Sequence, residues 1–106
     1  MNTAIKWESQ SNADTLIVAD GIAAEVALRL PDATFSWVTA DGVVALRVDA
    51  PAAYDPQYVW VEGLYGEVFV ADRPRSAGNY VRFWSDTSYE DIAAAVVERM
   101  TVPTFG

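Results

Sequence analysis

Glu62 and Glu67 are the residues whose type and spacing come nearest to chemistry. They flank the four-residue segment 63–66, so a regular hairpin would place the two carboxylates opposite each other. Carboxylates paired in this way can share a proton, hold a divalent cation or divide the roles of acid and base. Like charges in a cross-strand pair are destabilising, however. The simpler interpretation is that the turn splays the strands and leaves both acids in water, with Arg82 offsetting one charge.

A second candidate is a small group of arginines in a chain that is otherwise acidic. Arg73 and Arg75 lie on one loop, which Pro74 stiffens, and Arg82 follows in the next predicted strand. Guanidinium groups bind carboxylates and phosphates in a bidentate manner, so this loop could grip an anionic group of a partner. Alternatively, it is a solvated hairpin loop whose arginines pair with neighbouring acids such as Asp72.

The side chains that the sequence lacks narrow the possible functions further. Its 106 residues include no cysteine, no histidine and a single lysine, Lys6. A thiolate nucleophile, a disulfide and an imidazole base or ligand are therefore all excluded. The segment 63–66 begins and ends with glycine but lacks the glycine–lysine spacing of a phosphate loop. We expect a protein that is not an enzyme and that carries neither a metal ion nor a cofactor.

Composition and charge indicate one acidic globular domain spanning residues 1–106. Apolar residues make up 52% of the chain and charged residues 21%, and the net charge is −8. The acids are spread evenly, with seven in residues 1–50 and eight in residues 51–106, which disfavours direct binding to nucleic acid or anionic membranes. The longest run without a charge is the eight residues 33–40, too short to span a membrane. Because the first residues show no secretory signal, we expect a cytoplasmic protein.

The N-terminal third is predicted to form a short edge strand and then a helix. The strand covers residues 4–8. The segment 11–14 offers an N-cap with an acid three residues later, and apolar residues then recur at helical spacing over residues 15–30. Pro31 stops this helix.

Two features argue against that helix. Gly21 lies in its middle, at a cost of about 1 kcal/mol. The residues that follow Gly21 also alternate with a period of two, as a strand would. A strand over residues 15–19 followed by a helix from Asp20 is therefore an alternative.

The rest of the chain is predicted to form five antiparallel strands and a helix. The strands are expected at residues 34–39, 43–49, 58–62, 67–72 and 80–84. Asp41-Gly42 and the segment 63–66 turn two hairpins, and Thr87–Glu90 is a capping box that opens a helix through Arg99. This order predicts an α+β fold of two layers, a sheet of two hairpins plus one strand with an N-terminal and a C-terminal helix packed on one face.

Alternation in the last three strands predicts two unlike faces of the sheet. One face is rich in valine, and the helices, rich in small residues, suit it. The other face would be exposed unless a partner covers it, and it carries residue types that are enriched at binding hot spots. We predict that this contact surface contains Tyr58, Trp60, Phe69, Tyr80, Arg82 and Trp84, with Arg73 and Arg75 at its rim. Alternatively, the first hairpin, with Phe35 and Trp37, curls over these aromatics into a second small core, or the two faces are reversed.

These features predict a small acidic protein-binding domain, such as an inhibitor, immunity factor, chaperone or regulatory adaptor, which associates with itself as a homodimer through the aromatic face. An acidic mimic of nucleic acid is a second version of this hypothesis. The order of elements is loosely similar to that of type III secretion chaperones, a likeness of fold plan alone. The alternative is a small-molecule-binding domain or a carboxylate-based enzyme with a pocket near Glu62, Glu67 and Arg82.

Overall fold

The computed structural model of the chain describes residues 3–40, 42–63, 66–74 and 79–102, with side chains from residue 12 onward apart from that of residue 40. Two helices and five strands follow one another along the chain. They are α1 (Thr3–Arg29), β1 (Thr34–Ala40), β2 (Val43–Asp49), β3 (Gln57–Glu62), β4 (Glu67–Ala71), β5 (Tyr80–Phe83) and α2 (Tyr89–Thr101).

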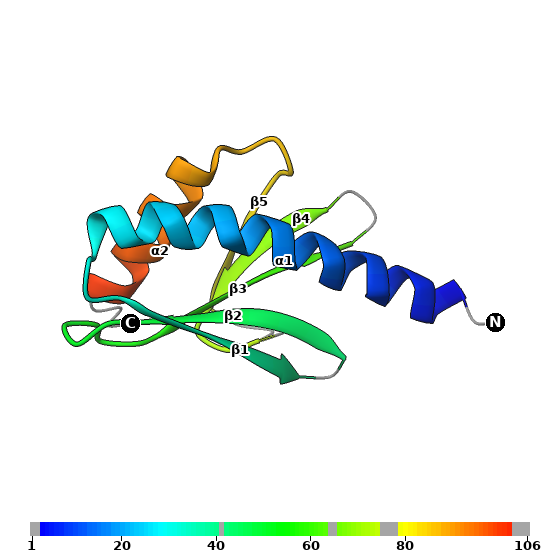
Figure 1. Cartoon of the computed structure of the whole chain (residues 1–106), viewed down its shortest axis with the longest axis horizontal. Coiled ribbons are helices and arrows are strands. Elements are labelled where there is room, and N and C mark those ends of the chain that lie inside the picture. Colours follow the sequence, from blue (N-terminus) through cyan, green and yellow to red (C-terminus); the bar gives the residue numbers. More distant parts are fainter. Residues whose placement is uncertain (1–2, 41, 64–65, 75–78, 103–106) are drawn as a thin grey trace.

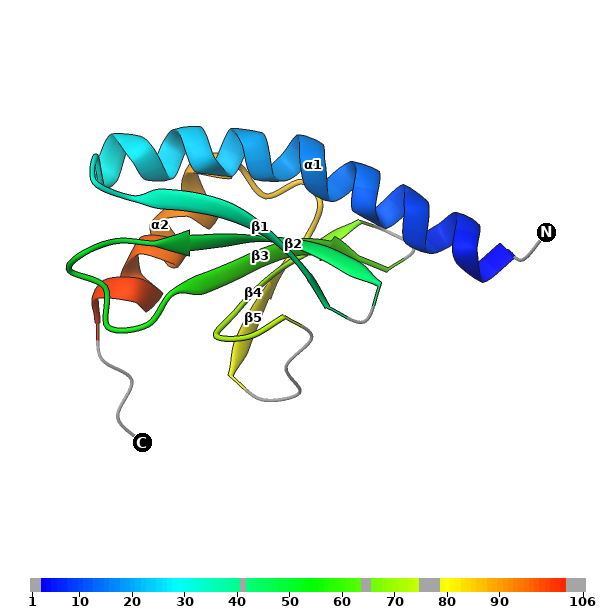
Figure 2. The same ribbon diagram turned by 60° about the horizontal axis from the view of Figure 1, so that its bottom comes forward.

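The strands form one antiparallel sheet, and both helices lie on the same side of it (Figure 1). The strand order in the sheet is the order in the chain, β1-β2-β3-β4-β5, so β1 and β5 are the two edges. In Figure 2, which is turned by 60°, α2 lies behind the strands, and no helix of the described residues covers the side of the sheet that faces away from α1 and α2. The predicted two-layer α+β fold is confirmed.

Helix α1 begins much earlier than the sequence pattern suggests. The predicted edge strand at residues 4–8 is wrong, because α1 runs without a break from Thr3 to Arg29. The helix-forming residues Ala4, Lys6 and Glu8 outweigh the weak alternation, and nothing before Gly21 interrupts the helix. The predicted split into a strand and a helix is wrong for the same reason. The N-terminal end of α1 extends beyond the sheet in both views (Figures 1 and 2).

Gly21 is explained by the crossing of the two helices. A Cβ atom at this position would overlap the ring of Tyr89, in the first turn of α2. The glycine therefore lets the two helices approach closely. The cost of a glycine inside a helix is offset by the packing of the two helices on the sheet.

The five strands lie where the pattern predicts, within one residue at each end. Val43 follows the first turn, in which Gly42 has a φ of 78° and Asp41 lies outside the described residues. A φ in this range suits glycine, in agreement with the predicted Asp-Gly hairpin. At the second turn Gly63 and Gly66 also have positive φ, of 89° and 66°.

Helix α2 begins one residue later than the predicted capping box implies. The N-cap is Ser88, whose Oγ accepts a hydrogen bond from the Asp91 backbone N–H at 3.1 Å. Glu90 and Asp91 lie in the first turn, where the helix dipole favours acids, and Arg99 lies in the last.

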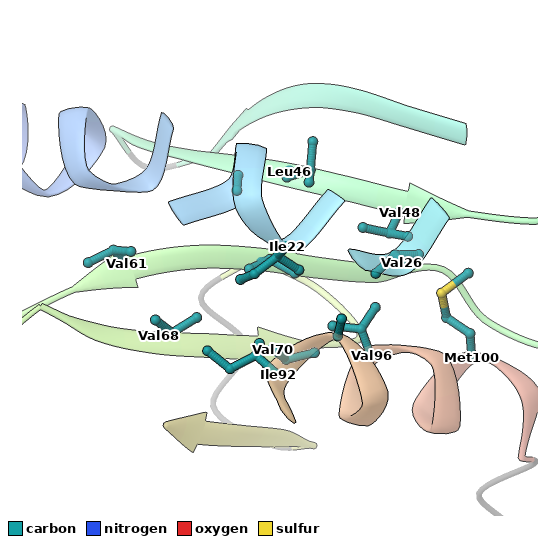
Figure 3. Packing of buried hydrophobic residues seen from close by; sticks show 13 residues of the cluster. Ile22, Val26, Leu46, Val48, Val61, Val68, Val70, Ile92, Val96 and Met100 are labelled. Carbon is teal, nitrogen blue, oxygen red and sulfur yellow. The ribbon is translucent and has the colours of Figure 1, made fainter. Parts of the chain in front are cut away.

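The helices bury the valine-rich face of the sheet, as predicted. Ile22 and Val26 of α1 and Ile92 and Val96 of α2 point into this core (Figure 3). From the sheet it receives Leu46, Val48, Val59, Val61, Val68 and Val70. Each such side chain contributes about 1.5–3 kcal/mol when fully buried, so this face accounts for most of the hydrophobic stabilisation.

Strands β2 and β3 separate at one end, and α1 fills the gap with polar side chains. Their ladder runs only from Leu46↔Val59 to Val48↔Gln57. Beyond it, the Val44 N–H donates to Asn12 Oδ1 at 3.1 Å, and Asn12 Nδ2 donates to the Gly42 carbonyl at 3.0 Å. The Val61 N–H donates to Thr15 Oγ1 at 2.8 Å. Asn12, which belongs to the predicted cap, instead fixes the β1–β2 hairpin to the helix.

Candidate functional site

The candidate site is the side of the sheet that faces away from the helices, here called the open face. Register and alternation assign its members without ambiguity. Among the side chains that the structure describes, they are Thr34, Ser36, Val38, Val43, Ala45, Arg47, Asp49, Tyr58, Trp60, Glu62, Glu67, Phe69, Ala71, Tyr80 and Arg82. Trp84 follows directly after β5. The structure thus brings together the six predicted contact residues.

The centre of the open face is a second small core. Trp60 is only 2% exposed and packs in a cluster with Val43, Ala45 and Ala71. The prediction that the whole aromatic face is exposed is therefore wrong at its centre. The first hairpin does contribute to this cluster, as one alternative proposed, but through Val38, Val43 and Ala45.

Phe35 and Trp37 do not cover the aromatics, contrary to that alternative. They pair with Val48 and Leu46, whose side chains belong to the helix-side core, and so lie on the opposite face of the sheet. The faces themselves are not reversed, since the valines lie inside.

Three aromatic rings cross the open face from β3 to β5. The rings of Trp60 and Phe69 stack, with centroids 5.4 Å apart and planes inclined by 12°. Phe69 and Tyr80 follow at 5.6 Å and 39°. Offset pairs of this kind stabilise the fold by about 0.5–1.5 kcal/mol beyond the effect of burial, so the row of rings forms a rigid support.

The exposed part of the open face lies at its β5 end. Tyr80 is 43% exposed, Trp84 is 63% exposed, and Arg82 between them is also exposed. The Arg82 guanidinium lies 6.0 Å from the centre of the Trp84 ring, at the limit of a cation–π contact. Arg82 Nε also lies 3.4 Å from Glu67 Oε2.

The two glutamates are directly opposite each other, as the spacing predicts. Glu62 pairs with Glu67 in the β3–β4 register. Glu62 Oε2 accepts a hydrogen bond from Trp60 Nε1 at 3.1 Å, and Glu67 forms an ion pair with Arg82. The described residues hold no group of three carboxylates close enough for a metal ion.

Arg47 is a cationic residue of the open face that the sequence analysis did not select. Its Nη2 donates to Asp49 Oδ2 at 3.1 Å. The pKa of Arg47 is raised, mainly by its hydrogen bond with Tyr58 and further by the charge of Asp49, against a lowering by desolvation. The residue therefore adds a permanent positive charge at the β2 side of the face.

The predicted arginine group is only partly assembled. Arg73 is exposed just after β4, Arg82 lies on the open face, and Arg75 is outside the described residues. Asp72, a predicted partner of this loop, instead contacts Arg99 of α2, with Oδ1 and Nη2 3.4 Å apart.

That contact belongs to a polar network around the buried Gln57, which sequence analysis missed. Arg99 Nε donates to Oε1 of the fully buried Gln57 at 2.7 Å, and Arg99 Nη2 donates to the Asn79 carbonyl at 2.8 Å. Gln57 Nε2 donates to Asp72 Oδ1 at 2.8 Å, and Asn79 Nδ2 donates to Asp72 Oδ2. The network ties α2 to β3 and to the residue that precedes β5.

On the helix side of the molecule, the described residues line at least two cavities. One, of about 400 Å³, is lined by residues that include Ile17, Val61 and Tyr89. The other, of about 370 Å³, lies between β5 and α2 and is lined by residues that include Phe83 and Val102. Neither is lined by Glu62, Glu67 or Arg82, around which the alternative hypothesis places a pocket.

Comparisons with protein-family models, with curated proteins and with solved structures find no significant match. Among the described residues, neither helix combines the length and the apolarity needed to cross a bilayer. The physical features of the open face are therefore the basis for a functional proposal.

Proposed function

We propose that this protein is a small acidic binding domain without catalytic activity, and that its partner is another protein, which contacts the β5 end of the open face. The observation that carries the proposal is the exposure of Tyr80, Arg82 and Trp84 together on this face. Tryptophan, tyrosine and arginine are the residue types that most often dominate binding energy at interfaces.

The packed row of aromatic rings next to these exposed side chains supports the proposal. Tyr80 rests against Phe69, which stacks on the buried Trp60. Because the row of rings is already packed, a partner would order few side chains on binding, which lowers the entropic cost. A rigid aromatic platform with a cation at its rim suits an apolar protein surface better than a polyanion.

The arrangement of charges on the open face supports protein binding rather than catalysis. Glu62 accepts a hydrogen bond from the indole N–H of Trp60, and Glu67 forms an ion pair with Arg82. A catalytic carboxylate pair would instead be expected to face a cavity. The net charge of −8 also disfavours nucleic acid as the partner.

The test is capture of partners from a cell extract by the wild-type chain, followed by affinity measurement with the purified partner. Trp84→Ala should weaken binding at least about tenfold, as the loss of a hot spot does. The control is Leu28→Ala, which removes a side chain 76% exposed on α1 and should leave binding unchanged. Equal binding by both variants would contradict the proposal.

Salt separates this proposal from the nucleic-acid mimic. A contact built on aromatic side chains should change little when the salt concentration is raised, whereas a contact built on the acidic surface weakens steeply. Binding that is lost in high salt and unaffected by Trp84→Ala would favour the mimic instead.

A further inference from the structure

The edge strand β1 differs from the rest of this acidic surface. It lies within residues 33–40, the longest stretch of the chain without a charge, and contains no proline or glycine. All seven residues of β1 pair with β2 in an unbroken register, so no bulge interrupts the strand. Edge strands are normally protected by charge, proline, bulges or short length, because their free backbone groups can pair with another chain. β1 uses none of these devices.

The direction of its free backbone groups follows from one hydrogen bond. The Val44 N–H donates to Asn12, so it points away from β1, and the pair Thr39↔Val44 is not hydrogen-bonded. Bonded and non-bonded pairs alternate along an antiparallel ladder. The N–H and C=O groups of Phe35, Trp37 and Thr39 therefore point outward from the sheet.

These three residues are spaced symmetrically about Trp37. In an antiparallel pair centred there, Trp37 meets its own copy and Phe35 meets Thr39 of the second chain. Each of the three pairs exchanges two bonds, which gives roughly six backbone hydrogen bonds. We propose that β1 pairs with β1 of a second copy of this chain about a twofold axis through Trp37, joining the two sheets into one. This proposal does not depend on the function proposed above.

Charge favours a second copy over another partner. A strand that pairs with itself brings identical residues together, so any charge near its centre would face a like charge at a cost. The absence of charge from β1 meets this requirement. Two molecules of net charge −8 repel each other least where the contact surface carries no carboxylates.

The surface around β1 adds apolar contact area. Trp37 is 49% exposed on the helix side of the edge. Leu16, Ala23 and Ala27 lie 4, 11 and 15 residues after Asn12, which puts them on the flank of α1 that meets the β1–β2 hairpin. Leu16 is 51% exposed. A second copy would cover both indoles beside these side chains, while the strand β5 stays at the outer end of each sheet. An isologous contact of this kind closes at two copies.

The first experiment is sedimentation of the full chain over a range of concentrations. We expect a dimer that dissociates on dilution and that strengthens as salt screens the repulsion between the two copies. Trp37→Lys should weaken it at least about tenfold, because it places like charges across the axis. The matched control Trp84→Lys changes an exposed tryptophan near the other edge and should not. A chain that stays monomeric at about 0.5 mM, open-ended assemblies, or a dimer sensitive to Trp84→Lys alone would overturn the proposal.

The second experiment tests the register, using the absence of cysteine from the chain. In Trp37→Cys the two Cα atoms would lie about 5.5 Å apart, within the range of about 4.4–6.8 Å that a disulfide spans. Mild oxidation should then convert most of the protein to a covalent dimer. In the control Thr34→Cys the two sites would lie roughly 20 Å apart, and no such product should form. Equal cross-linking of both variants would overturn the register, and circular dichroism verifies that all variants fold.

Discussion

The two edges of the sheet are built in opposite ways. β1 has seven residues, carries no charge and pairs with β2 along its whole length, whereas β5 has four residues and includes Arg82. β5 is also anchored at both ends, by the network of Arg99 at its start and by the cap of α2 soon after its end. β1 is held on its inner side through the hairpin and Asn12.

This difference concerns pairing of backbone groups at the two sheet edges, which β5 is built to prevent and β1 is not. Short length, a charge and fixed ends protect β5 in the way that edge strands of monomers are protected. β1 lacks these protections although the chain has 22 charged residues available, 15 acidic and 7 basic. The contrast yields four predictions about stability, from the largest expected effect to the smallest.

The largest effect is expected at the anchor of β5. Arg99→Met removes the donor to Oε1 of Gln57, a residue with no exposed surface, and also removes the donors to Asp72 Oδ1 and the Asn79 carbonyl. A buried acceptor left without a partner costs about 1–3 kcal/mol, and more where the donor was charged. We expect a loss of about 3 kcal/mol in the free energy of unfolding, measured in urea at one fixed protein concentration.

The control for this prediction is Arg29→Met. Arg29 Nη1 lies 3.5 Å from Glu25 Oε1, and Arg29 Nη2 lies 3.9 Å from Glu90 Oε1. All three side chains are substantially exposed. Such surface pairs contribute less than about 1 kcal/mol. Similar losses in the two variants would mean that the polar network does not anchor β5.

The second effect concerns the inner side of the β1–β2 hairpin, where β2 and β3 separate. Thr15→Val keeps the shape of a buried side chain but leaves the Val61 N–H without its acceptor. The expected loss is about 2 kcal/mol, again by urea denaturation. Thr34→Val, the same substitution at an exposed site in β1, should change stability by less than about 0.5 kcal/mol. A small effect at Thr15 would mean that water replaces the hydroxyl there.

Both of these networks show why part of the structure could not be predicted from the sequence. Gln57 and Arg99 are 42 residues apart, and Thr15 and Val61 are 46 apart. Hydrogen bonds between polar groups that are distant in the sequence leave no local pattern, because they depend on how the helices pack on the sheet. The same holds for the burial of Trp60, which depends on the first hairpin packing against the second.

What could be predicted has a period or a turn signal. Alternation in 58–62, 67–72 and 80–84 identified the strands and the valine face to within one residue, and glycines identified the hairpins. Residues 4–8 failed because five residues are too few to distinguish two periods, and helix propensity decided the outcome. The edge β1 did leave a signal, the uncharged run 33–40, but its meaning depends on knowing that this strand lies at an edge.

The third effect concerns the N-cap of α2, the helix that follows β5 in the chain. Ser88→Ala removes the acceptor for the Asp91 N–H and should cost about 1 kcal/mol. Ser85→Ala, the same substitution at an exposed position three residues earlier, should cost much less. Urea denaturation of the two variants measures the difference. Equal losses would show that α2 does not depend on this cap.

The smallest effect lies between the two edges, at the pair of glutamates. Glu62→Gln removes the repulsion with Glu67 while the amide oxygen can still accept from Trp60 Nε1. Because like charges in a cross-strand pair cost a few tenths of a kcal/mol, the variant should be more stable than the wild type by roughly that amount. The gain should shrink in high salt, which screens the repulsion. Asp55→Asn, which removes one charge from an exposed loop, is the control for a general effect of net charge. If the two carboxylates instead shared a proton or a cation, Glu62→Gln would destabilise the protein. That result would make the pair of glutamates a candidate catalytic or metal-binding site.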